Sequence, residues 1–116
     1  MYFHANYVST SPSGDGDYYQ AMFEAEQDAD DLDSQYLLIQ RHFEDPDDNW
    51  CYIETHDEKY CGHFLLRRVD CTPQKLSIEL DRPRDNFVSV TFAMVATEFA
   101  EASQVLKIIS GEIEPP

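Results

Sequence analysis

Apolar and polar residues alternate with a period of two along most of the chain, which predicts a protein built mainly of β-strands. The alternation is cleanest in Lys75–Asp81, where Leu76, Ile78 and Leu80 would face a core. Further strands are predicted at Tyr2–Val8, Tyr18–Ala25, Gln35–Phe43, Trp50–Thr55, Tyr60–Asp70 and Asn86–Met94. Residues that favour turns separate these segments. The sequence therefore predicts a meander of six or seven mostly antiparallel strands.

Only the last segment has helical periodicity. Thr97 is a candidate N-cap, and Lys107 and Gly111 stand where a helix would end. One apolar stripe follows from the spacing of Phe99, Ala102, Leu106 and Ile109. Because a single amphipathic helix has to bury its stripe, we expect it to pack on the sheet. The predicted fold class is α+β in one domain over residues 1–116, with a strand and flexible loop in 1–17 and a frayed tail at 112–116.

The segment 44–49 is rich in turn-forming residues and predicts a hairpin between the strands on either side. A symmetric hairpin places Phe43 opposite Trp50 and Arg41 opposite Tyr52, with Glu54 as the diagonal neighbour of Arg41. The predicted pair of Arg41 and Glu54 has two interpretations. It either holds the two strands together or orients Glu54 at a binding surface.

The negative charge of the chain is concentrated in its first half. Residues 1–58 carry fifteen acids and one base, Arg41, whereas residues 59–116 carry eight acids and seven bases, for a net charge of −15. An excess confined to one half creates a directed field, which selects a basic partner. Phosphate binding needs clustered Lys and Arg, so we expect neither nucleic acid nor an anionic membrane as a ligand.

Cysteine content and the absence of an apolar run indicate a cytoplasmic protein. Cys51, Cys61 and Cys71 are odd in number, which suits reduced thiols in a reducing compartment. No apolar run approaches the ~18 residues of a membrane span. The first residues, Met1–His4, lack the basic and apolar stretches of a signal peptide.

Metal binding and catalysis find little support in the residue spacings. A calcium loop that begins at Asp28 would place Leu32 at a ligand position, Asp33 where glycine is needed and Ile39 where the bidentate glutamate belongs. The cysteines form no Cys-x-x-Cys pair for zinc. The chain also lacks a Gly-x-Ser-x-Gly elbow and a phosphate-binding glycine-rich loop. We therefore expect a protein without enzymatic activity, cofactor or metal.

From Tyr36 onward a series of short segments resembles one known protein family. The likeness begins with Tyr36-Leu37-Leu38-Ile39-Gln40-Arg41 and continues through Cys51-Tyr52-Ile53-Glu54, the strand around Gly62, and Val69-Asp70. It resumes at Lys75-Leu76-Ser77-Ile78-Glu79-Leu80 and ends with Val88-Ser89-Val90-Thr91-Phe92, Glu98-Phe99 and the helix. These segments are similar to the Immunity protein 10 family of polymorphic toxin systems. The resemblance implies a protein that binds and neutralises a cognate toxin domain.

An acidic surface suits such a role, because it raises association rates with a basic partner by ~10- to 1000-fold. Trp50 is a candidate aromatic anchor beside acidic residues, and packing in the core against Phe43 is the competing interpretation. The predicted partner-binding residues are Asp28, Asp30, Asp31, Asp33, Glu44, Asp45, Asp47, Asp48, Trp50 and Glu54. Two other functions stay open: an acidic interaction module or regulator unrelated to toxins, and a divalent-cation-binding protein.

Overall fold

The computed structural model describes residues 1–12, 18–26, 34–43 and 50–113. The described residues form nine strands, one 3-10 turn and one α-helix. In chain order these are β1 (Tyr2–His4), β2 (Tyr7–Pro12), β3 (Tyr18–Glu24), β4 (Tyr36–His42), β5 (Cys51–Thr55), η1 (Glu58–Tyr60), β6 (Gly62–Phe64), β7 (Leu66–Thr72), β8 (Lys75–Leu80), β9 (Phe87–Thr91) and α1 (Ala96–Ile109).

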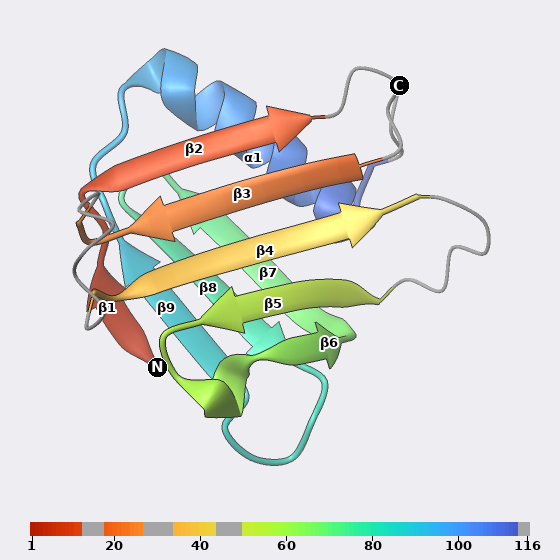
Figure 1. Ribbon diagram of the computed structural model, residues 1–116. Coiled ribbons are helices and arrows are strands. Elements are labelled where there is room, and N and C mark those ends of the chain that lie inside the picture. The colour runs from red at the N-terminus through yellow and green to blue at the C-terminus, as the bar shows by residue number, and fades with distance from the viewer. Residues whose placement is uncertain (13–17, 27–33, 44–49, 114–116) are drawn as a thin grey trace.

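The strands form two sheets that lie one over the other (Figure 1). The five-stranded sheet has the order β2-β3-β4-β5-β6 and is antiparallel throughout. The four-stranded sheet has the order β1-β9-β8-β7 and is mixed, because β1 runs parallel to β9. The helix packs against β2, β3 and β7. The predicted α+β class is confirmed, and so is the packing of the terminal helix on strands.

Nine strands in two sheets replace the predicted single meander, because two predicted strands each divide between the sheets. In Tyr2–Val8 the chain crosses at Ala5 and Asn6: Ala5 N–H bonds to Thr91 O at 2.8 Å, and Asn6 N–H bonds to Glu24 O at 2.9 Å. In Tyr60–Asp70 it crosses at Leu65, whose carbonyl accepts from Asp81 N–H at 2.9 Å. Each of these segments reads as one continuous strand in the sequence, so the change of sheet was not predicted.

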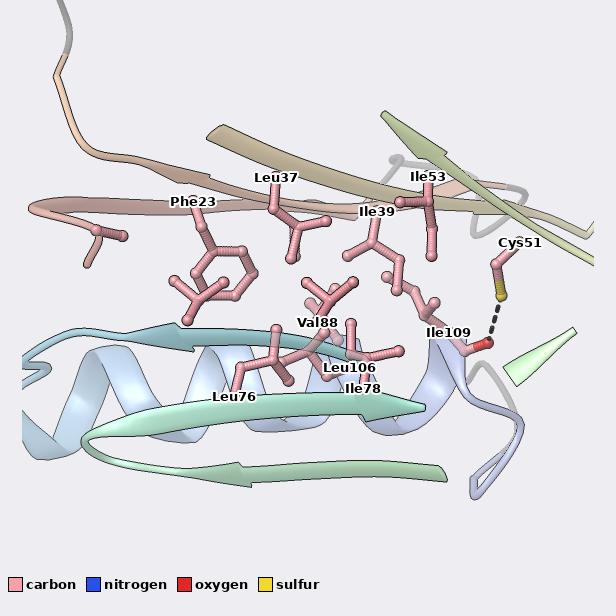
Figure 2. Packing of buried hydrophobic residues seen from close by; sticks show 14 of the residues in the cluster. Phe23, Leu37, Ile39, Cys51, Ile53, Leu76, Ile78, Val88, Leu106 and Ile109 are labelled. Atoms are coloured by element: carbon pink, nitrogen blue, oxygen red, sulfur yellow. Dashed lines mark hydrogen bonds between the residues drawn. The ribbon is translucent and has the colours of Figure 1, made fainter. Parts of the chain in front are cut away.

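One hydrophobic core fills the space between the layers (Figure 2). The predicted inward residues of β8, namely Leu76, Ile78 and Leu80, are buried. The five-stranded sheet contributes alternating residues from its central strands, and Phe23 of β3 stacks on Phe92 with ring centroids 5.5 Å apart. The core residues that the two sheets contribute include Tyr19, Ala21, Phe23, Leu37, Ile39, Ile53, Leu76, Ile78, Leu80, Val88 and Val90.

The helix begins earlier than its candidate cap predicts. Val95 is the N-cap residue, and Glu98 accepts a hydrogen bond from its backbone N–H at 3.5 Å. Thr97 lies inside the first turn. The predicted stripe is buried at Ala102, Leu106 and Ile109, half-buried at Phe99, and extended by Val105 and Ile108. No helix in the described part of the chain has the length and apolar character that crossing a bilayer requires.

The helix ends in a glycine cap. Gly111 has φ +82°, a conformation that glycine adopts without steric cost. Its N–H bonds to Ile108 O at 3.1 Å, and the N–H of Glu112 bonds to Lys107 O at 2.9 Å. Glu112 and Ile113, the first residues of the predicted frayed tail, are thus held by the cap. The predicted flexible loop after Val8 is wrong for residues 9–12, which belong to β2. Residues 13–17 of that loop and residues 114–116 of the tail lie outside the described residues.

Candidate protein-binding face

The outer surface of the five-stranded sheet is the candidate functional site. Along β3, β4 and β5, one set of alternate residues is buried in the core and the other set points outward. The four-stranded sheet and α1 both lie behind this sheet in Figure 1. We call the outward surface the open face. Its central residues are Tyr18, Gln20, Met22, Glu24, Tyr36, Leu38, Gln40, His42, Tyr52 and Glu54.

The open face is both aromatic and acidic. Four of the seven tyrosines of the chain lie on it: Tyr7, Tyr18, Tyr36 and Tyr52. The strands β2 to β6 contain two carboxylates, Glu24 and Glu54, and both point outward. Their single Lys or Arg is Arg41, which faces the core. Tyrosine is enriched at protein interfaces, so this composition is typical of a surface that binds another protein.

Glu54 is the centre of a three-residue cluster on the open face. The Tyr36 hydroxyl donates to its Oε2 at 3.0 Å, and the Tyr52 hydroxyl donates to its Oε1 at 2.8 Å. Tyr36 reaches it diagonally from β4, while Tyr52 lies two residues away on β5. We call Tyr36, Tyr52 and Glu54 the tyrosine–carboxylate cluster. The two hydroxyls fix the orientation of the carboxylate.

Burial and the carboxylate keep both hydroxyls protonated. Partial burial raises the pKa of Tyr36 to about 12, and the hydrogen bond to Glu54 and its negative charge add to the effect. For Tyr52 the hydrogen bond to Glu54 is the main cause that raises the pKa, followed by burial. Both phenols therefore remain donors to Glu54 at neutral pH.

Titration of the tyrosines tests this cluster. The tyrosinate absorbance of the wild type and of Tyr36→Phe is measured against pH, and the second curve is subtracted from the first. We expect the difference to contain one component that titrates at about pH 12. Because the folded pKa lies above the ordinary value of 10.0, the contribution of the neutral hydroxyl to stability is complete below pH 10 and is lost as pH rises through about 12. Tyr7→Phe is the control and should leave that component in place. A difference curve without it would contradict the cluster.

A second hydrogen-bonded group orders the neighbouring part of the open face. Gln40 Nε2 donates to the Tyr18 hydroxyl at 2.9 Å and to Gln20 Oε1 at 2.8 Å. Tyr18 in turn donates to Gln20, and its ring lies 4.8 Å from that of His42. Side chains already held in place lose little conformational entropy when a partner binds. The open face is therefore preorganised for binding.

The predicted pair of Arg41 and Glu54 is wrong. The strands pair Gln40 with Tyr52 and Leu38 with Glu54, one residue away from the register of a symmetric hairpin. A shift of one residue exchanges the two faces of a strand, so Arg41 points into the core and Glu54 onto the open face. Arg41 is 4% exposed, and its Nη1 donates to Ile109 O at 3.0 Å. Tyrosine hydroxyls, rather than Arg41, orient Glu54.

Two predicted partner-binding residues lie in the described part of the chain. Glu54 belongs to the cluster, and Trp50, directly before β5, is 44% exposed. That exposure favours an anchor over a core residue, and Phe43 packs instead on Tyr19, with ring centroids 5.8 Å apart. The remaining predicted residues are outside the described residues: Asp28, Asp30, Asp31, Asp33, Glu44, Asp45, Asp47 and Asp48.

The described residues on either side of the acidic segments show where these segments attach. Residues 27–33 connect β3 to β4, and residues 44–49 connect β4 to β5, so the attachment points lie at opposite ends of β4. Residues 13–17 connect β2 to β3 at the same end as 44–49, because Tyr18 pairs with His42. That segment contains Asp15 and Asp17. That the segments 13–17 and 44–49 attach at the same end of the sheet could not be predicted from the sequence, because it depends on strand pairing.

The three cysteines are free thiols. Cys51 pairs with Phe64 across β5 and β6. The Cys51 thiol donates to Ile109 O at 3.4 Å, and burial raises the pKa of Cys71 to about 11. Within the described residues, no group of three His, Cys, Asp or Glu side chains is placed to hold a metal ion.

Comparisons with protein-family models, curated proteins and solved structures found no match for this chain. The resemblance to the immunity family therefore stays a prediction from the sequence. A functional proposal has to rest on the open face and on the charge of the chain.

Proposed function

We propose that this protein is a bacterial immunity protein that binds a cognate toxin domain in the cytoplasm and thereby neutralises it. The observation that carries the proposal is the open face: it is preorganised, rich in tyrosine, and acidic without an outward Lys or Arg among its described strands. Acidic segments are attached at both ends of its central strand. A basic toxin domain is the partner that this surface fits.

Binding rather than catalysis is the role that the chemistry of the open face favours. Both hydroxyls of the tyrosine–carboxylate cluster are engaged as donors, and their raised pKa values make them poor proton acceptors at neutral pH. General base catalysis needs a group whose pKa lies near the working pH. The cluster instead offers a fixed negative charge between aromatic rings, which is suited to recognition.

The test is to search the genes next to the one for this protein for a toxin domain and to measure rescue of growth when the two are co-expressed. We expect the wild type to restore growth and to bind the purified toxin domain in a defined stoichiometry. The variant with Asp45, Asp47 and Asp48 all replaced by Asn should bind ~10-fold more slowly at low salt and lose most of the difference at high salt. Asp70→Asn, a change on the four-stranded sheet, is the control and should associate as the wild type does.

Two results would overturn the proposal. One is growth that stays arrested although the protein is expressed and folded. The other is tight binding to a partner without toxic activity, which would favour the acidic interaction module. An association rate that does not change with salt would remove the electrostatic part of the proposal and leave the binding role.

A further inference from the structure

We propose that the tyrosine–carboxylate cluster is a binding site for a guanidinium group. An arginine side chain of the partner lies between the rings of Tyr36 and Tyr52 and makes a bidentate ion pair with Glu54. This inference deepens the proposed function and rests on it for the identity of the partner. The site itself is defined by contacts within this chain.

The hydrogen bonds already made by Glu54 leave it shaped for an arginine. A carboxylate has about four lone-pair positions on its two oxygens. Tyr36 occupies one on Oε2, and Tyr52 occupies one on Oε1. One position therefore remains on each oxygen. Two parallel N–H donors of a guanidinium match two adjacent acceptors of this kind, whereas a lysine ammonium approaches as a point charge.

The rings beside Glu54 supply the second element of the site. Glu54 pairs with Leu38, so Tyr52 and Tyr36 stand on opposite sides of it along the strand direction, and the hydroxyls of both reach its carboxylate. The ring of Tyr52 lies 5.3 Å from that of His63, and the ring of Tyr36 lies 6.4 Å from that of His56. These contacts restrict the motion of the rings. A cation over the face of a tyrosine is attracted by the ring, and arginine makes this contact more often than lysine does.

Charge completes the case for a cationic ligand. Glu54 accepts its two hydrogen bonds from neutral hydroxyls, so neither bond cancels its charge. The strands of this sheet contain a single Lys or Arg, and that residue, Arg41, points into the core. The ion pairs of Arg67 and Arg68 lie on the four-stranded sheet. The negative charge on the open face is therefore available to a cation from a partner.

The experiment measures binding of short oligoarginine and oligolysine peptides to the full chain by NMR. We expect oligoarginine to shift the ring resonances of Tyr36 and Tyr52 and to bind several-fold more tightly than oligolysine. Glu54→Gln should weaken oligoarginine binding about tenfold. Glu101→Gln, which removes the same charge from the exposed side of α1, is the matched control and should change it less than about twofold.

A double variant, Tyr36→Phe with Tyr52→Phe, keeps the rings and the charge and removes only the hydroxyls. It should bind oligoarginine more weakly than the wild type and should lose the preference over oligolysine. Equal losses in Glu54→Gln and Glu101→Gln, or equal binding of the two peptides by the wild type, would overturn the site. If Glu54→Gln fails to fold, oligoarginine binding by the double variant tests the site instead.

The failure of this inference is distinguishable from that of the proposed function. Oligoarginine binding that depends on Glu54, together with no rescue from a toxin, supports the site and rejects the immunity role. Rescue by a protein that does not distinguish arginine from lysine rejects the site and retains the role. A purely structural cluster would lower the stability of Glu54→Gln and leave peptide binding unchanged.

Discussion

Replacing Phe23 with alanine is expected to lower the free energy of unfolding by about 3–5 kcal/mol. Phe23 is 0% exposed on β3, and its ring stacks on Phe92, which follows β9 in the other sheet. Alanine removes this contact between the layers and leaves a cavity that packed neighbours fill only in part. Chemical denaturation followed by circular dichroism measures the loss.

The matched control for Phe23→Ala is Met22→Ala, at the neighbouring position on the open face. Met22 is only partly buried, so its truncation should cost about 1 kcal/mol or less. Similar losses in both variants would mean that the space between the sheets does not supply the main stabilisation. Phe23→Leu, which conserves more of the volume, should recover a large part of the loss.

Arg41→Met is the second variant with a large expected effect, a loss of about 2–4 kcal/mol of unfolding free energy. The guanidinium donates to Ile109 O at the end of the helix and lies 4.6 Å from the centroid of the Phe43 ring. Methionine conserves much of the apolar stem but removes the charge-assisted hydrogen bond to a buried carbonyl. The Cys51 thiol, 3.4 Å from the same carbonyl, is a weaker donor. The loss is measured by chemical denaturation.

Arg68→Met is the control for Arg41→Met. Arg68 is an exposed residue of β7 that pairs with Asp70 on the surface, and such pairs contribute little in water. Stability close to that of the wild type is expected for this variant. An equally small change in Arg41→Met would show that the bond to the end of the helix does not matter. Arg41→Lys should be intermediate, because lysine keeps the charge without the planar donors of arginine.

Close approach of the Arg41 side chain to the backbone of residue 111 explains why a glycine stands there. A Cβ atom at position 111 would lie 3.2 Å from Arg41 Nη1. Gly111 therefore satisfies two requirements, the positive φ of the cap and the space for the guanidinium. Helix α1 and strand β4 are joined at this point, which links the end of the chain to the strand at the centre of the open face.

Much of the fold followed from alternation, because burial of one side of a strand has a direct sequence pattern. The inward residues of β8 were predicted correctly in this way, and the apolar stripe of α1 was predicted from its helical spacing. The division into two sheets was not predicted, because the segments around Ala5 and Leu65 each read as one continuous strand in the sequence. Pairing across long distances in the sequence, such as β1 with β9, also has no local signal.

The candidate site was predicted only in part, because the predicted pairing of β4 with β5 was wrong by one residue. Acidity and the aromatic neighbour directed attention to Trp50 and Glu54, and both are accessible in the structure. Tyr36 was missed as a partner of Glu54 because their contact depends on how β4 pairs with β5. Tyr52 lies two residues from Glu54 on the same strand, so the alternation of β5 alone could have indicated that contact. An error of one residue in that pairing moved Arg41 to the wrong face and assigned it to Glu54.

The length of β4 sets a lower limit on the size of a partner that uses the whole site. Its seven residues separate the attachment points of the two acidic segments, and six steps of ~3.3 Å place Tyr36 and His42 about 20 Å apart. An extended peptide that lies across the strands reaches one end of β4. A folded domain with a contact surface of ordinary area, ~800 Å² on each side, reaches both. A partner of the proposed kind that contacts both ends of β4 would therefore need a contact surface at least this long.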